Sequence, residues 1–248
     1  MGDDFQGIYP SWEDAMEVAT GYGAPEILEK AKIAVQKIKS GEAVFERDTI
    51  LYDEPHYSYP VISYLLYAAS AGNNRLRVLD FGGSLGSLYF QCRPFLDGLA
   101  ELSWNVVEQP GFVEYGRSHV AEGPLSFYHT IEECMAEEKP DVLLLSGILQ
   151  LLKDPYDFLS RVFAHRFKYI IIDRTPMTQE EHFLSVQFVS PEIYDASYPS
   201  WFFNQDEFMN FLETEYEILD YFDSFESWVV EGIHAQNMGF LLQRRDWD

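Results

Sequence analysis

Residues 77–86 read Arg-Val-Leu-Asp-Phe-Gly-Gly-Ser-Leu-Gly, and this stretch decides the fold. A short apolar strand ends in the acid Asp80, and the chain then turns through Gly82, Gly83 and Gly86. Glycines at a turn from strand to helix let the backbone approach a ligand closely, because no Cβ stands in the way. A triphosphate-binding loop would need Gly-Lys-Ser/Thr, which is not present. The stretch therefore predicts a different kind of ligand-binding turn.

From residue 76 onward, strand-like apolar runs alternate with helical segments. Continuous apolar runs such as 142–145 are typical of central parallel strands that are covered on both faces. The last two strands are close enough in sequence to form a hairpin, so we expect the final strand to be antiparallel. The predicted fold class is α/β, with a Rossmann-like, seven-stranded, mostly parallel sheet. Its expected strands cover 77–81, 103–108, 125–128, 141–146, 169–173, 216–221 and 238–244.

The first 75 residues predict a helical N-terminal extension or lid, followed by one domain over 76–248. One helix is expected over 25–39, because Pro25 suits a first helical position and Gly41 lies just beyond the end. A second helix is expected over 60–71. Residues 1–24 are expected to be rich in turns, with Trp12 as an anchor.

Candidate ligand-binding residues follow the first four predicted strands. Open α/β sheets bind ligands beyond the carboxyl ends of their strands. Glu108 follows the second strand, 22 residues after Gly86, near the interval at which an acid meets a ribose in dinucleotide folds. Its carboxylate can accept hydrogen bonds from both ribose hydroxyls. Thr130 and Ser146 follow the third and fourth strands, where each could instead cap the next helix.

These segments resemble, in order and spacing, the class I S-adenosylmethionine (SAM) methyltransferases. The resemblance covers residues 76–175, with 78–86 similar to the first motif of the family and Glu108 similar to its ribose-binding acid. One departure is Ser84, which stands where the family usually has glycine. The resemblance implies SAM as the cofactor, and the residues expected to bind it are Asp80, Gly82, Gly83, Ser84, Gly86, Glu108, Thr130 and Ser146.

The acceptor is less closely defined by the sequence. Together with the motifs, segments 45–48 and 195–203 resemble a little-characterised methyltransferase branch associated with bacterial surface-polysaccharide gene sets. This implies O-methylation of a small-molecule or saccharide-linked acceptor. A hydroxyl acceptor needs a base, and histidine suits that role because its pKa lies near neutrality. His182, after the fifth strand, is the first candidate, and His56, ahead of the core, is the second.

Two further features have alternative interpretations. The dense aromatic run 198–203 is expected to be an insertion, which forms either a wall of the acceptor site or a hydrophobic plug beneath a loop. Arg174 could bind an anionic group of the acceptor or pair with a neighbouring acid.

Two other functions remain open. Residues 82–86 also match Gly-x-Ser-x-Gly, the nucleophile elbow of α/β-hydrolases, with Ser84 as nucleophile. Asp173 or Asp195, with His234, would complete the triad. A hydrolase elbow normally follows several strands and a His-Gly-Gly-Gly-like segment, and neither is seen upstream. The second alternative is a non-catalytic, SAM-binding relative of the methyltransferases.

Composition excludes several classes of partner. The chain has 41 acids against 17 lysines and arginines, a net charge of −24, which repels nucleic-acid backbones. The two cysteines, Cys92 and Cys134, are not in a CxxC pair and predict buried thiols in a reducing cytoplasm. No apolar stretch approaches the ~20 residues of a membrane span. No cluster has metal-ligand spacing, so no metal is expected.

Overall fold

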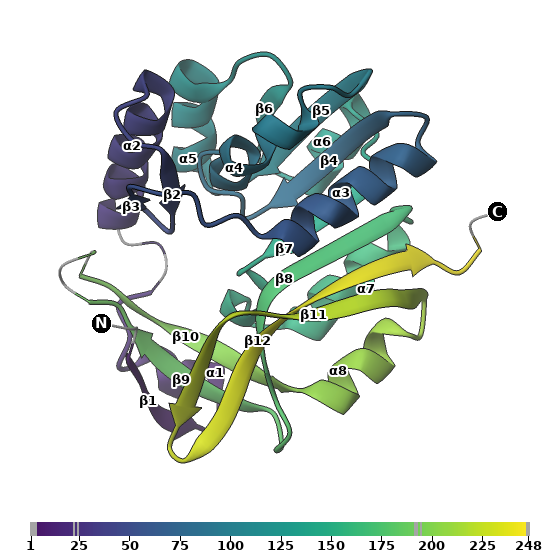
Figure 1. The fold of residues 1–248 in the computed structure, drawn as a ribbon. Coiled ribbons are helices and arrows are strands. Elements are labelled where there is room, and N and C mark those ends of the chain that lie inside the picture. Colours follow the sequence, from purple (N-terminus) through teal and green to yellow (C-terminus); the bar gives the residue numbers. More distant parts are fainter. Residues whose placement is uncertain (1–3, 22, 24, 191–192, 194, 247–248) are drawn as a thin grey trace. The chain divides into compact units, whose positions relative to one another are not determined.

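A computed structural model of the protein describes residues 4–21, 23, 25–190, 193 and 195–246. Contacts divide the chain into two compact units (Figure 1). Residues 28–145 form one, here named the glycine-turn unit; residues 1–27 and 146–248 form the other, named the split unit because it is built from two chain segments. These divisions fall at other places than the predicted boundary after residue 75. A role of residues 1–75 as a lid stays a prediction.

The glycine-turn unit contains four parallel strands in the order β6-β5-β4-β7. They are β4 (Arg75–Phe81), β5 (Glu101–Val107), β6 (Leu125–Tyr128) and β7 (Val142–Ser146). The apolar run of β7 is buried at four successive positions, 142–145. Burial on both faces explains why this strand lacks an alternating pattern. The expectation of a mostly parallel sheet is confirmed.

Helices and a small hairpin complete this unit. The helices predicted at 25–39 and 60–71 are present as α2 (Pro25–Ser40) and α3 (Tyr59–Ala71). The hairpin of β2 (Phe45–Arg47) and β3 (Ile50–Tyr52) was not predicted, because three-residue strands are too short to show alternation. The remaining elements are α4 (Ser87–Leu96), α5 (Pro110–Tyr115), the π-helix η1 (Gly116–Val120) and α6 (Ile131–Glu137).

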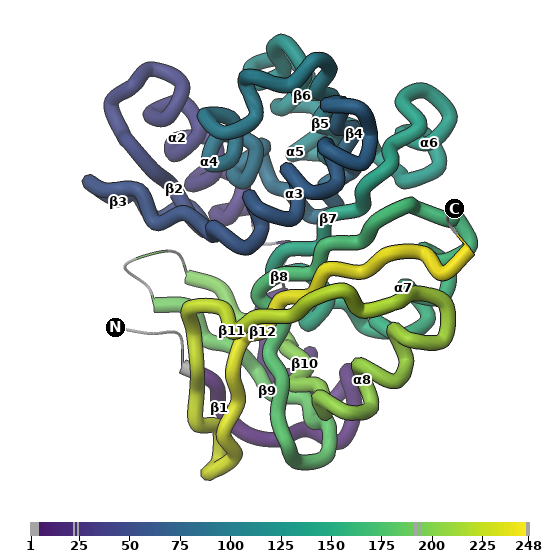
Figure 2. Tube along the Cα trace, turned by 45° about the vertical axis from the view of Figure 1, so that its right-hand side comes forward, coloured from purple at the N-terminus to yellow at the C-terminus, as the bar shows by residue number. Residues whose placement is uncertain are grey.

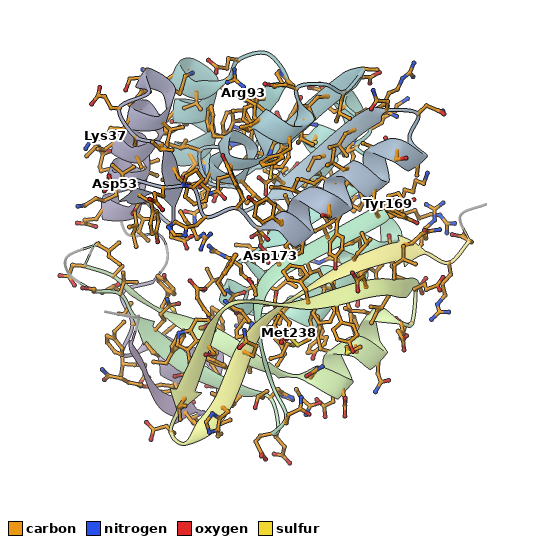
Figure 3. All side chains as sticks on the ribbon, viewed as in Figure 1. Lys37, Asp53, Arg93, Tyr169, Asp173 and Met238 are labelled. Carbon is orange, nitrogen blue, oxygen red and sulfur yellow. The ribbon has the colours of Figure 1, made fainter. Side chains whose placement is uncertain are left out.

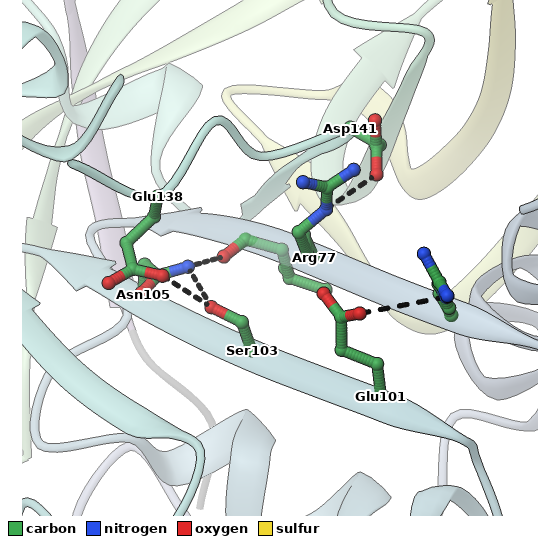
Figure 4. Close-up of polar contacts among 8 residues, drawn as sticks. Arg77, Glu101, Ser103, Asn105, Glu138 and Asp141 are labelled. Atoms are coloured by element: carbon green, nitrogen blue, oxygen red, sulfur yellow. Dashed lines mark hydrogen bonds and ion pairs between the residues drawn. The ribbon is translucent and has the colours of Figure 1, made fainter. Parts of the chain in front are cut away.

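Polar contacts tie the neighbouring strands of this unit together (Figure 4). Arg77 Nε lies 3.1 Å from Asp141 Oδ2, just ahead of β7. The buried Asn105 amide donates to the Val78 carbonyl at 2.9 Å and to Ser103 Oγ at 2.8 Å. These contacts join strands to one another. Ligands of open α/β sheets bind beyond the carboxyl ends of the strands, where the glycine turn lies.

The split unit is built around β8 (Tyr169–Thr178) and a long hairpin of β11 (Tyr216–Val230) and β12 (Ile233–Arg244). β12 pairs antiparallel with both β8 and β11, so the predicted antiparallel last strand is confirmed. Figure 2 shows the two hairpin strands running beside each other, well beyond the predicted strand limits. The helices of this part are the 3-10 turn η2 (Leu149–Leu151), α7 (Pro155–Ala164) and α8 (Gln205–Leu212).

Three more strands of this unit were not predicted. β1 (Asp4–Tyr9), β9 (Phe183–Phe188) and β10 (Ser197–Asn204) pair antiparallel, with α1 (Trp12–Met16) beside them. The prediction of a turn-rich N-terminus was therefore wrong. The aromatic run 198–203, expected as an insertion before the last two strands, does lie there and forms strand β10; it does not alternate because most of its side chains are buried.

Aromatic contacts hold the N-terminal segment against these strands. Phe5 lies edge-on to Phe202 with ring centroids 5.0 Å apart. Trp12 stacks on Trp201 at 6.4 Å, so its predicted role as an anchor is confirmed. Cys92 and Cys134 are buried and form no disulfide, as expected. Among the described helices, none has the length and apolar character needed to cross a membrane.

The packing of Phe202 gives a stability prediction. Its ring is fully buried and stacks on Phe183 at 4.7 Å. We expect Phe202→Ala to lower the free energy of unfolding by about 3–5 kcal/mol, because it leaves a cavity among aromatic rings. Phe225→Ala, at a side chain that is 64% exposed, should change it by less than ~0.5 kcal/mol. Equal effects in urea unfolding would contradict this account of the core.

Candidate cofactor site

The buried carboxyl group of Asp80 lies at the centre of the site. Asp80 ends the apolar part of β4 and is only 2% exposed. The Trp104 indole Nε1 donates a hydrogen bond to Asp80 Oδ2 at 3.0 Å. Burial raises the pKa of Asp80 to about 7; the Trp104 hydrogen bond opposes the rise, and the nearby charge of Glu108 adds to it. The Asp80 carboxyl group therefore changes its protonation state near neutral pH.

The glycine turn closes over this carboxyl group. Gly82 and Gly86 have φ of +74° and +85°, and Ser84 between them has φ of +53°. The Gly82 N–H donates to the Val107 carbonyl at 2.9 Å, which joins the turn to the end of β5. These left-handed conformations suit glycine, and serine adopts one at a higher energy. The departure from the methyltransferase motif at Ser84 is therefore accommodated by the backbone.

Gly83 is required for a different reason, because its φ is not left-handed. A Cβ on Gly83 would overlap Asp80 Oδ2, closer than Cβ atoms normally approach a neighbouring atom. Glycine at this position lets the turn approach the acid closely. The spacing of Asp80 and Gly83 in the sequence thus corresponds to direct packing of the turn on the buried carboxyl group.

Glu108 links the end of the second strand to the same turn. Its carboxylate accepts hydrogen bonds from the Gln109 N–H at 2.5 Å and from the Ser84 N–H. Burial raises the pKa of Glu108, while these two hydrogen bonds lower it. The structure therefore brings together Asp80, the turn of 82–86 and Glu108, as the sequence predicted.

Sequence reasoning missed Trp104, because its contact with Asp80 depends on the register of two strands. Trp104 is paired in register with Val78 on the neighbouring parallel strand. Val78 and Asp80 lie two residues apart and share a face, so Trp104 and Asp80 are diagonal neighbours on that face. Its indole then supplies the hydrogen bond that a buried carboxylate needs.

A pocket within the glycine-turn unit was also missed. It encloses about 540 Å³, part of it open to solvent, between α2, the β2–β3 hairpin and α4. Ser84, Ser87, Glu46 and Tyr57 are among the residues that line it. The Glu46 carboxylate accepts hydrogen bonds from Ser87 Oγ and from the Thr49 N–H, which fastens the hairpin beside the glycine turn. No pattern in a single sequence indicates this long-range pairing.

The other predicted cofactor residues have local partners. Thr130 caps α6, accepting a hydrogen bond from the Glu133 N–H at 3.0 Å, which is the alternative that the sequence left open. Ser146 Oγ donates to the buried Asp173 carboxylate at 3.3 Å, within the split unit, and does not cap a helix. Ser224 Oγ also donates to Asp173, which is labelled on β8 in Figure 3. Burial raises the pKa of Asp173, and the charge of Arg174 lowers it.

The two candidate bases belong to different units. His182 lies in the split unit, where its exposed ring Nδ1 is 3.2 Å from Glu207 Oε2 on α8. β8 continues to Thr178, so His182 follows the end of an extended strand and not a turn directly after Asp173. His56 lies in the glycine-turn unit, in edge contact with Tyr52 and Phe45. Within the described part of the chain, no group of His, Cys, Asp or Glu side chains could hold a metal ion.

Comparison with known proteins supports the fold. The structure is similar to that of the N-terminal domain of EvdMO1, determined in the presence of S-adenosylhomocysteine (SAH) and D-fucose, with a TM-score of 0.51 and 15% identity over 91% of this chain and 98% of that chain. The fold is that of the SAM-dependent methyltransferases.

Two further methyltransferase structures are similar in fold to this chain. A SAM-dependent methyltransferase from Clostridium acetobutylicum matches with a TM-score of 0.50 and 13% identity, over 87% of this chain and 98% of that chain. One from Methanosarcina mazei matches with a TM-score of 0.52 and 12% identity, over 77% and 99%. Neither the family models nor the curated proteins give a match to the sequence.

The close approach of Gly83 to Asp80 predicts the effect of a single methyl group. Gly83→Ala should lower the free energy of unfolding by roughly 1–3 kcal/mol, because the added Cβ forces the turn away from the acid. Gly98→Ala is the matched control, since nothing lies within 4 Å of its Cβ position. Thermal unfolding of both variants measures the difference. A Gly83→Ala variant as stable as Gly98→Ala would contradict the described packing.

The pKa of Asp80 predicts how ligand-free stability depends on pH. The Asp80 carboxyl group has a pKa of about 7 in the folded chain and an ordinary value of 3.8. It therefore keeps its proton to a higher pH in the folded chain than in the unfolded one. Its contribution to stability therefore falls as pH rises between these values, by up to about 4 kcal/mol. Asp80→Asn removes the charge, so the variant should gain stability over the natural chain from pH 5 to pH 8.

Urea unfolding at several pH values measures this gain. Asp97→Asn, at an exposed position in the same unit, serves as the control and should shift stability by less than ~0.5 kcal/mol. A stability difference between Asp80→Asn and the natural chain that stays constant over this pH range would show that Asp80 does not titrate there.

Proposed function

We propose that the protein binds SAM at the carboxyl ends of β4 and β5 and transfers its methyl group to a hydroxyl of a small-molecule or saccharide-linked acceptor. One observation carries the proposal: the turn of 82–86 is packed onto the buried carboxyl group of Asp80 and hydrogen-bonded to Glu108. The surrounding fold is shared with SAM-dependent methyltransferases.

The residues of this site fit the chemistry of SAM. Asp80 is a buried acid next to a neutral indole and another acid, and a cationic ligand would stabilise its charged form. Glu108 has the acceptor oxygens needed for ribose hydroxyls. The turn and the first residues of α4 present backbone N–H groups suited to a carboxylate. SAM itself supplies an activated methyl group, so the chain has mainly to align donor and acceptor.

His182 is proposed as the base that removes the proton of the acceptor hydroxyl, with His56 as the second candidate. The contact between His182 Nδ1 and Glu207 supports the choice, because a carboxylate beside an imidazole orients the ring for proton transfer. A saccharide-linked acceptor is the class to test first, since the similar EvdMO1 structure was determined with D-fucose. Replacing each histidine by alanine should lower turnover of the acceptor without changing SAM affinity.

Experiments with the purified protein also test the two alternatives, a hydrolase and a non-catalytic SAM-binding protein. The hydrolase alternative is supported by the left-handed φ of Ser84, which a nucleophile elbow also has. It is weakened because the strands before β4 in this unit form only the separate β2–β3 hairpin. Labelling of Ser84 by a fluorophosphonate probe would favour a hydrolase. Tight SAM binding without turnover of any sugar or alcohol would favour a non-catalytic SAM-binding protein.

Calorimetric titration with SAM tests the cofactor site directly. Because the cation favours ionised Asp80, SAM should bind about tenfold more tightly at pH 8 than at pH 6. Asp80→Asn should weaken SAM binding at pH 8 and remove this pH dependence, whereas Asp97→Asn should leave both unchanged. The absence of any binding of SAM or SAH to the folded protein would refute the proposed function.

A further inference from the structure

The split unit has a concave surface along its hairpin. The register pairs Gln236 with Met177 and Asp223 with Met238, so these side chains lie on the same face. Met238 is labelled on β12 in Figure 3. α8 covers the part of this face near Phe240, where the ring of Phe208 lies 5.8 Å away. Gln205, the first residue of α8, lies at the border of the part of the hairpin surface that is open to solvent.

The open part forms a groove of about 1090 Å³, which includes space open to solvent. We name it the hairpin groove, because residues of β11 and β12 form most of it. Its lining residues are Met177, Thr178, Gln179, Gln205, Tyr221, Asp223, Ser227, Trp228, Val229, His234, Ala235, Gln236 and Met238. All of them belong to the split unit, so the groove is complete within that unit.

A bulge and the side-chain amide of Gln236 fix the curvature of the groove. The pairing of β11 with β12 shifts between Asp223 and Ser227, which bends the hairpin seen in Figure 2. The Gln236 Nε2 group donates to the carbonyls of Ser224 at 2.6 Å and Glu226 at 3.1 Å, both in the bulge. These bonds hold the Gln236 side chain in place and leave its Oε1 as an acceptor. The groove is therefore preformed.

The groove combines an apolar floor with neutral polar groups. Met177 and Met238 are buried at its base, and the ring of Tyr221 is 54% exposed beside them. Gln179 Nε2 donates to Gln205 Oε1 at 2.6 Å. The Gln179 oxygen remains an acceptor, and the Gln205 nitrogen, which also donates to Met209 Sδ at 3.9 Å, keeps a second N–H as a donor. Hydroxyls of a sugar can donate to the Gln179 oxygen and accept from the Gln205 nitrogen.

Charge narrows the class of ligand. No lysine or arginine is among the described residues that line the groove, while Asp223 contributes a carboxylate. A phosphate or carboxylate ligand would meet neither lysine nor arginine there and would be repelled by the carboxylate of Asp223. An exposed aromatic ring, side-chain amides and hydroxyls are suited to a neutral ligand with an apolar face and many hydroxyls.

We propose that the hairpin groove binds a neutral saccharide, with the sugar ring against Tyr221 and its hydroxyls on Gln179, Gln205 and Gln236. This inference deepens the proposed function, because the groove would hold the sugar of a saccharide-linked acceptor. It rests on the proposed function only for that role. Binding itself depends on the groove alone.

Saturation-transfer NMR with the full chain tests the proposal. The probes are the methyl glycosides of glucose, galactose, mannose and fucose, with glucose 6-phosphate as the charged counterpart. At least one neutral glycoside should bind in the millimolar range and glucose 6-phosphate should bind more weakly. Failure of all four glycosides to bind, or tighter binding of the phosphate, would overturn the proposal.

Variants locate the binding. Tyr221→Ala and Gln179→Ala should each weaken binding of the best glycoside roughly three- to tenfold, because they remove a stacking ring and a hydrogen-bond acceptor. Phe225→Ala, at an exposed β11 position outside the groove lining, is the matched control and should bind as the natural chain does. Circular dichroism confirms that each variant is folded. Equal affinity of all three variants would place the sugar elsewhere and overturn the proposal.

Calorimetry with SAM separates this inference from the proposed function. Binding of SAM without binding of any glycoside would refute the groove and leave the methyltransferase proposal intact. Binding of a glycoside that Tyr221→Ala weakens, in a protein that binds neither SAM nor SAH, would support the groove and refute the methyltransferase proposal.

Discussion

The contact between the buried carboxyl group of Asp80 and the backbone of Gly83 is the constraint on which the site depends. An acid at a 2% exposed position is unfavourable unless it is protonated, hydrogen-bonded or neutralised. Trp104 supplies one hydrogen bond, and the turn lies so close that a Cβ at residue 83 would overlap the carboxyl group. The same closeness brings the Ser84 amide to Glu108, so one packing requirement organises both strand ends.

A buried acid near its point of ionisation is a feature that folding alone does not favour. An apolar or amide side chain at position 80 would avoid the penalty that burial places on the charged form. Residues that oppose stability in this way are common at ligand sites, where the bound molecule removes the penalty. At the site proposed for SAM, Asp80 is therefore an acid whose charged form a cationic ligand would stabilise.

The split unit shows a different principle, in which a long hairpin creates a surface that a short one would not. β11 and β12 extend past the part of the sheet that α8 covers, and a bulge bends them. Side chains beyond the part that α8 covers line the groove. Extra strands β1, β9 and β10 build a second aromatic core in the same unit, around Phe5 and Phe202.

The sequence by itself determined the parallel strands, the glycine turn and the place of Glu108, because short-range patterns of apolar residues, glycines and acids encode them. It did not determine the strand at 197–204, since burial on both faces removes the alternation by which strands are recognised. Trp104 on Asp80, Glu46 on Ser87 and the hairpin groove were decided only by tertiary structure. Each of them joins residues that are distant in the chain, and their meeting depends on strand register and packing, which no local pattern records.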